Sequence, residues 1–272
     1  MISVSMDYID SIRSRETATR FFELFRNVYP ELSFKSMDEW EPLKRRFALD
    51  EAIDEWVANR GPGSQTQFGR MIFYGDNPAP FYVFANWQGV GTHGRWIDSI
   101  SAMFDESYWM KNKIIKPTDR LIKLLKGLSI LGNSLYGRGY HKSEFEAKAF
   151  NERTLKGGRV SRESISLTSR EGIIDLFWAN YLGRPYVDFF GEATIARVKC
   201  TLNERVGNGF LLVFAQDPLN WNDEQTLSQQ KSAKAELDHG AFVEKSTNFS
   251  PSLKFGTESH SHERIADRAS GI

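Results

Sequence analysis

The spacing of apolar residues predicts several helices along the chain. In residues 17–28 apolar side chains recur at i, i+3, i+4 and i+7, the spacing of a helix with one apolar face, and Pro30 ends that helix. Leucines spaced in the same way predict a helix over 118–131. Residues 37–59 hold another helical stretch, which is interrupted near Pro42.

Other stretches are typical of strands. Residues 68–74 and 80–88 are rich in aromatic and β-branched side chains and flank a Gly-Asp-Asn-Pro turn, which predicts a hairpin. Residues 93–104 are expected to form a third strand, although the spacing of their apolar residues fits a helix nearly as well. A second hairpin is predicted from 195–203 and 209–215.

The remaining C-terminal elements are short. A short apolar helix is expected at 172–180, followed at 181–191 by a compact turn that ends in half a helix. Asn222 or Asp223 would cap a polar helix over 223–237.

This order of elements predicts an α+β fold, with one or more antiparallel sheets and helices packed on one face. We expect a single domain over residues 1–245, in which 1–116 and 117–245 form two fused, similar halves. Residues 246–272 are polar and lack a periodic apolar face, so a flexible C-terminal tail is expected there.

Composition excludes several classes of protein. The chain has 272 residues, 35 Lys and Arg against 35 Asp and Glu, and a single cysteine, Cys200. One cysteine cannot form a disulfide framework or a zinc ribbon, and a neutral balance gives no footprint for nucleic acid or an anionic membrane. The sequence contains neither an apolar run of about 20 residues nor a signal-like N-terminus, so we expect a cytoplasmic protein without a membrane partner.

The sequence predicts no catalytic, cofactor-binding or metal-binding residue. Its five histidines do not fall in a metalloprotease pattern, and the cluster of His260, His262 and Glu263 lies in the expected tail. Cys200 sits in a predicted strand, where a lone cysteine usually behaves as a small buried hydrophobe. The glycine pairs, including Gly137 and Gly139, match no phosphate-binding loop and are interpreted as turns.

One segment combines tryptophans with arginine, a composition typical of protein–protein hot spots. Trp87, Trp96 and Trp109 lie in it close to Arg95, and we predict that these four residues contact a partner. The alternative is that the aromatic side chains fill the core of the sheet.

A second part of the predicted partner surface is acidic. Asp50 and Asp54 lie four residues apart on the expected helix, as do Glu51 and Glu55. Like charges at this spacing cost a few tenths of a kcal/mol per pair, so such a face suits a basic partner. Drift of an ordinary solvated helix surface is the alternative.

The segment 177–221 carries a resemblance to a known family. It begins with Phe-Trp-Ala-Asn-Tyr-Leu-Gly-Arg-Pro-Tyr-Val-Asp-Phe-Phe-Gly over 177–191 and ends with Phe-Ala-Gln-Asp-Pro-Leu-Asn-Trp over 214–221. These motifs resemble those of bacterial immunity proteins of polymorphic-toxin and contact-dependent systems. The resemblance implies a protein that binds a cognate toxin and blocks it without catalysis, and it brings no catalytic residues.

The sequence therefore predicts one leading function, without catalysis, and leaves two alternatives open. The first is an immunity protein that neutralises a cognate toxin or effector by occlusion. The second is a phage or mobile-element protein that binds a host defence component or a signalling nucleotide, with Arg95 or Arg184 on phosphate. The third is an unusual enzyme built on His93, His141 and scattered acids.

Overall fold

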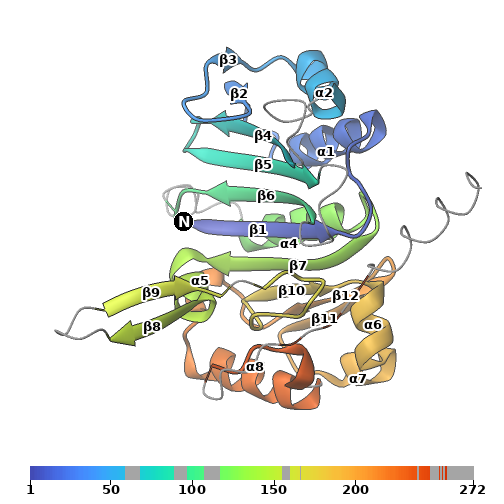
Figure 1. Cartoon of the computed structure of the whole chain (residues 1–272), viewed down its shortest axis with the longest axis vertical. Coiled ribbons are helices and arrows are strands. Elements are labelled where there is room, and N and C mark those ends of the chain that lie inside the picture. Colours follow the sequence, from blue (N-terminus) through green and yellow to red (C-terminus); the bar gives the residue numbers. More distant parts are fainter. Residues whose placement is uncertain are drawn as a thin grey trace, which may run out of the picture.

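The computed structural model describes residues 1–58, 68–88, 97–106, 117–154, 160–165, 167–237, 239–245, 251, 253 and 255. They form a ten-stranded sheet and a separate two-stranded hairpin, with helices around the large sheet (Figure 1). Every strand pair is antiparallel, so the predicted α+β class with an antiparallel sheet is confirmed. The strand order is β11-β12-β10-β7-β1-β6-β5-β4-β2-β3.

The N-terminal part of the chain supplies one half of the large sheet. Its strands are β1 (Ile2–Tyr8), β2 (Ser36–Asp38), β3 (Arg45–Arg46), β4 (Phe68–Gly75), β5 (Phe81–Gln88) and β6 (Asp98–Phe104). Its helices are α1 (Arg15–Val28), α2 (Leu49–Ala58) and α4 (Pro117–Ser129). The predicted hairpin of β4 and β5 and the helices near 17–28 and 118–131 are confirmed.

The C-terminal part supplies the other half. Its strands in the large sheet are β7 (Ser134–His141), β10 (Ala179–Leu182), β11 (Leu202–Val206) and β12 (Gly209–Val213). Strands β8 (Phe150–Thr154) and β9 (Val160–Ser164) form the separate hairpin, which projects from the side of the molecule in Figure 1. Its helices are α5 (Lys142–Ala149), α6 (Arg184–Phe190), α7 (Glu192–Arg197) and α8 (Glu224–Glu236), with short 3-10 turns at Pro218–Asn220 and His239–Ala241.

Helices cover a different face in each half of the sheet. Successive residues of a strand point to opposite faces. Tyr181 and Leu211 join the buried cluster that contains the apolar residues of α1, α2 and α4, whereas their neighbours Leu182 and Leu212 join the cluster built with α6, α7 and α8. The expectation that all helices pack on one face is therefore incomplete, because the two cores lie on opposite faces.

The centre of the sheet is a strand that the sequence analysis did not predict. In β1 the apolar Ile2, Val4, Met6 and Tyr8 alternate with polar residues, both sets are buried, and the strand pairs with β6 on one side and β7 on the other. A period of two is the ordinary signal of a strand. This signal was present in the N-terminal sequence.

Strand β7 corrects the interpretation of two glycines as a turn. Gly137 and Gly139 lie in this strand between β1 and β10. A Cβ on Gly139 would come within 2.9 Å of the Trp178 ring, and one on Gly137 within 2.5 Å of the Met6 methyl group. Neighbouring side chains fill the space over both positions, and this close packing explains glycine inside a strand.

Three other segments differ from the predictions. Residues 37–59 form β2, β3 and α2 rather than a broken helix, because the chain turns back beside β4 before α2 begins. Within 172–180 the chain enters β10 and forms no helix, and 195–203 holds the end of α7 and the start of β11. Cys200 accordingly lies in the connection between α7 and β11 rather than in a strand.

The sheet is continuous across the expected boundary near residue 116. Strand β1 pairs with β7 along its whole length, so the N-terminal and C-terminal strands share one hydrogen-bonded sheet. None of the helices formed by the described residues is long and apolar enough to cross a membrane.

Candidate partner-binding surfaces

Of the aromatic residues predicted to contact a partner, the structure describes only Trp87, and it lies in the core. Its side chain is 1% exposed and packs on Trp56 with ring centroids 5.8 Å apart. Trp87 is therefore unavailable to a partner, as expected of a tryptophan that fills the core. Arg95, Trp96 and Trp109 lie outside the described residues.

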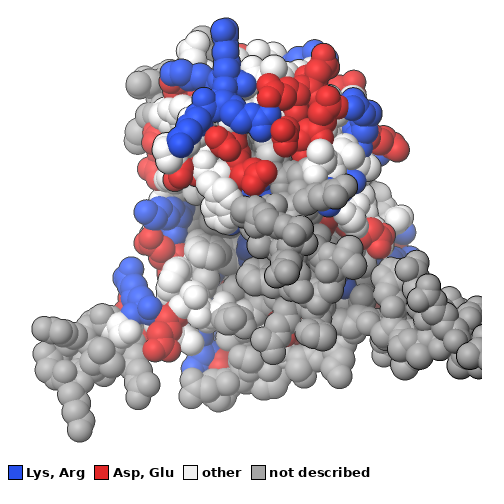
Figure 2. Space-filling view, turned by 45° about the horizontal axis from the view of Figure 1, so that its top comes forward, with Lys and Arg blue, Asp and Glu red and all other residues white. Residues whose placement is uncertain are grey.

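The acidic residues of α2 do lie on the surface. The Asp50 side chain is exposed, and that of Asp54 is 63% exposed and pairs with Arg15. Figure 2 shows Lys and Arg side chains beside Asp and Glu side chains at the end of the molecule formed by β2, β3 and α2. Arg45 reaches both Glu51 and Glu55 there, so the chain itself supplies cations to most of this acidic face.

Two residues considered for catalysis have structural contacts. His141 is the N-cap of α5, where its Nδ1 accepts the Ser143 N–H, and its Nε2 contacts the Glu106 carboxylate. Burial raises the pKa of the Cys200 thiol to about 11, and its Sγ lies 3.0 Å from the Leu202 carbonyl oxygen. A thiol held in its protonated form is a poor nucleophile at neutral pH. The part of the chain that the structure describes brings together no group of three metal-ligating side chains.

The C-terminal half buries an ion pair within α5, where that helix meets α8. Lys148 Nζ lies 2.7 Å from Glu144 Oε1 and also donates to Gln230 Oε1 and to the Leu176 carbonyl oxygen. Burial raises the pKa of Glu144, while the nearby Lys148 acts against that rise. These contacts fix α5 and α8 relative to β10 and offer no exposed polar group to a partner.

A second surface lies on the face of β4, β5 and β6 opposite α1 and α2. The register places Tyr74 across from Tyr82, and these residues, with Phe84, are aromatic and only partly buried. The Tyr74 and Tyr82 ring centroids are 4.8 Å apart, and the ring of Phe84 stacks 6.0 Å from that of Tyr82. Partly exposed aromatic rings in a row are the side chains that protein interfaces favour.

The loop between β2 and β3 rises beside these tyrosines. The Asp38 carboxylate accepts the N–H groups of Glu39 and Lys44, which closes the loop on itself. Trp40, 48% exposed, stacks with the guanidinium of Arg70 on β4 at 5.2 Å from the ring centroid. The loop is therefore held to the sheet at both its base and its side.

A groove of about 600 Å³ lies between this loop and the sheet. We call it the tyrosine groove. The residues that line it are Ser36, Glu41, Pro42, Leu43, Tyr74 and Tyr82. Burial raises the pKa of Tyr82, and electrostatic interactions with Glu41 and with Tyr74 add to that rise.

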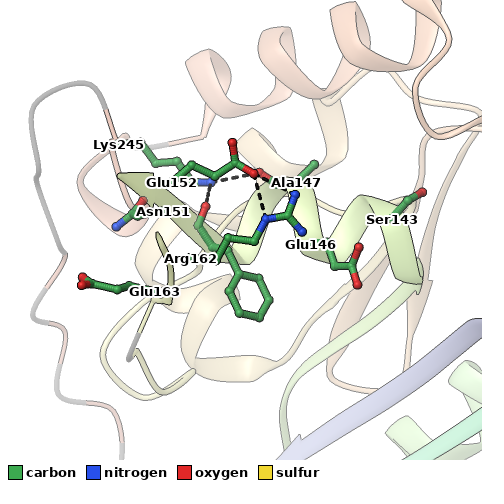
Figure 3. A pocket seen from close by; sticks show the side chains of 9 residues that line it. Ser143, Glu146, Ala147, Asn151, Glu152, Arg162, Glu163 and Lys245 are labelled. Carbon is green, nitrogen blue, oxygen red and sulfur yellow. Dashed lines mark hydrogen bonds and ion pairs between the residues drawn. The ribbon is translucent and has the colours of Figure 1, made fainter. Parts of the chain in front are cut away.

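A larger groove, of about 940 Å³, lies between α5 and the β8–β9 hairpin (Figure 3). Lys245 donates to the carbonyl oxygens of Ala147 and Phe150, and Glu152 pairs with Arg162 at 2.8 Å. Figure 3 shows these contacts as dashed lines, so Lys245, Glu152 and Arg162 are satisfied within the protein.

The residues of the tyrosine groove were not predicted to bind a partner, although the sequence did indicate that two of them face each other. Residues at equal distance from the turn of an antiparallel hairpin face each other, and this places Tyr74 opposite Tyr82 in the predicted β4–β5 hairpin. Glu41 and Pro42 carried no such signal, since their position depends on how the loop folds back over the strands.

Comparisons with known proteins establish the fold alone. No protein-family model and no curated protein sequence matches the chain. Among solved structures the chain is similar to a Pseudomonas aeruginosa T6SS protein, PA0821, with a TM-score of 0.53 and 10% sequence identity. The similarity covers 94% of this chain and 79% of that protein, so the two share an architecture that includes both halves of the large sheet.

Proposed function

We propose that this chain is a binding protein that neutralises a cognate toxin or effector of a bacterial secretion system by occluding it. The observation that carries the proposal is the similarity of fold, over 94% of the chain, to a protein described as belonging to the T6SS. The family resemblance of residues 177–221 supports the same function independently, because it rests on sequence motifs alone.

The architecture is consistent with an inhibitor that works by its surface. The motif segment spans β10, α6, α7, β11, β12 and the 3-10 turn at Pro218–Asn220, and its aromatic Tyr186 and Phe190 are buried in the core. These residues build the scaffold. Contact with the toxin is expected elsewhere, on the partly exposed face that carries Tyr74, Tyr82 and Phe84.

Co-expression tests the proposal directly. The candidate toxin is the C-terminal domain of a secreted protein encoded beside this chain, produced in a bacterial host with and without the chain. We expect the chain to restore colony formation and to co-purify with the domain as a stable complex. Survival unchanged by the chain, together with no complex on size-exclusion chromatography, would contradict the proposal.

A pair of variants shows which surface is used. Tyr82→Ala removes a partly exposed ring from the open face, whereas Asp188→Ala removes an exposed carboxylate on α6 that pairs with Arg184. We expect Tyr82→Ala to weaken toxin binding by about tenfold or more, as hot-spot aromatic residues do. Asp188→Ala should leave binding unchanged, and circular dichroism should show that both variants fold.

A further inference from the structure

The tyrosine groove has a chemical character that the general proposal of a protein partner leaves unexplained. Its floor consists of Tyr74 and Tyr82, whose rings are tilted by 43° to each other. Glu41, Pro42 and Leu43 from the loop between β2 and β3, with Ser36 of β2, complete the lining. Two phenol rings, a proline and a carboxylate therefore line one open groove.

The carboxylate of Glu41 is exposed and has no ion-pair partner among the residues that the structure describes. The neighbouring cations Lys35 and Arg45 are each paired elsewhere, Lys35 with Asp76 at 2.6 Å and Arg45 with Glu51 and Glu55. Among the described residues that line the groove, Glu41 is the one charged side chain, and exposed Arg46 lies opposite Ser36 in the β2–β3 register at its edge.

Aromatic rings and a carboxylate together favour a cation. The face of a phenol ring carries negative potential and attracts an ammonium or guanidinium group placed over it. The methylene stem of a Lys or Arg side chain also packs on an apolar wall while its charged end stays near a carboxylate. The Glu41 carboxylate would repel an anionic side chain. A purely apolar side chain would make no favourable contact with that carboxylate or with the phenol hydroxyls.

We propose that the tyrosine groove receives a lysine or arginine side chain of the partner protein, with the cation beside Glu41 and over the rings of Tyr74 and Tyr82. This inference rests on the proposed function for the identity of the partner. The volume of about 600 Å³ leaves room for the side chain and the backbone on either side of it.

The groove is tested first without any toxin. N-acetyl-arginine amide and N-acetyl-lysine amide are titrated into the full chain labelled with carbon-13 in its tyrosine rings, and N-acetyl-norleucine amide serves as the neutral control. We expect shifts confined to Tyr74 and Tyr82, with a dissociation constant of the order of 1–10 mM for the cations. Equal binding of the neutral amide, or no shift at about 100 mM cation, would overturn the proposal.

Matched variants separate charge from shape. Glu41→Gln keeps the side-chain volume and should weaken binding of the cationic amides about three- to tenfold. Glu39→Gln removes a charge from the same loop outside the groove lining and should change binding less than twofold. Tyr82→Phe keeps a ring face and should bind like the native chain, whereas Tyr82→Leu should lose most of the affinity. Equal effects of Glu41→Gln and Glu39→Gln would refute a specific role of Glu41.

The toxin complex provides the last step and keeps the two proposals apart. In a complex that forms, Glu41→Gln should lower affinity for the toxin, and replacing one Lys or Arg of the toxin by Met should abolish the effect of Glu41→Gln. A toxin complex indifferent to Glu41→Gln would refute the groove as its docking site while leaving the proposed function intact. Absence of any toxin complex, with the amides still bound, would instead count against the proposed function.

Discussion

The two halves of the large sheet differ in what covers one of its faces. In the C-terminal half, Leu182 and Leu212 on that face are buried beneath α6 and α8. In the N-terminal half the corresponding face carries Tyr82, Phe84 and Asn86, all partly buried. Hydrogen-bonded pairing continues from one half to the other through β7, β1 and β6, with one register shift between Asp7 and Tyr8 in the β1–β7 pair.

This difference follows from where the helices go. Helices α1, α2 and α4 pack on the other face of the N-terminal strands, so the face with Tyr82 keeps side chains that tolerate water. Phenol and amide groups satisfy that requirement and remain able to make contacts. The comparison indicates that the C-terminal half mainly stabilises the scaffold, whereas the N-terminal half presents a surface.

The largest expected loss of stability comes from breaking the buried ion pair of the C-terminal half. Lys148→Met leaves the Glu144 carboxylate buried without its cation, and we expect a loss of about 3–5 kcal/mol in the free energy of unfolding. Asn86→Ala, which removes the acceptor of Arg70 on the open face, should cost about 1 kcal/mol. Urea unfolding followed by circular dichroism measures both.

A second substitution should restore the stability that Lys148→Met removes from the C-terminal half. In Glu144→Leu/Lys148→Met an apolar pair replaces the two buried charges, and most of the lost stability should return. A double variant as unstable as Lys148→Met alone would show that this cluster matters for its shape rather than for its charges.

An intermediate effect compares apolar side chains on the same face. Leu212→Ala in the covered half should cost about 2–5 kcal/mol, because it opens a cavity in a closed core. Phe84→Ala in the open half should cost less, about 1 kcal/mol, because water already reaches part of that ring. Thermal and chemical unfolding measure both variants. If Leu212→Ala and Phe84→Ala lowered the free energy of unfolding equally, the face of β5 would be covered as completely as that of β12.

The smallest effect concerns Asp7, which lies on β1 between the two halves. Burial raises the pKa of Asp7, while Arg138 and the hydrogen bond from Ser169 act against that rise. The folded chain therefore holds a proton that the unfolded chain releases above its usual pKa of 3.8, so stability decreases as the pH rises from that value through the raised pKa.

Asp7→Asn removes this titration. The variant should lose stability less steeply than the native chain as the pH rises above 3.8, the usual pKa of this carboxyl group. Unfolding by urea at each pH provides the measurement. A slope identical to that of the native chain would show that Asp7 ionises in the folded protein as it does in the unfolded one.

Local pattern predicted the peripheral elements well and the central ones poorly. A single apolar face predicts helices α1 and α4, and aromatic residues on either side of a turn predict strands β4 and β5. Strand β7 does not, because Gly137 and Gly139 suit a turn until Met6 and Trp178 are seen packed against them. Likewise Trp87 belongs to a segment whose composition is typical of a hot spot. Only the packing of its ring on Trp56 shows that it lies in the core.

The sequence by itself determined the α+β class, the antiparallel hairpin of β4 and β5, and the main amphipathic helices, because periodicity and turn chemistry act between near neighbours. Tertiary structure alone decided that β1 joins the two halves, that helices cover opposite faces, and that Glu41 stands beside Tyr74 and Tyr82. These arrangements depend on residues far apart in the chain, whose meeting is fixed by the burial of the whole core and not by any local signal.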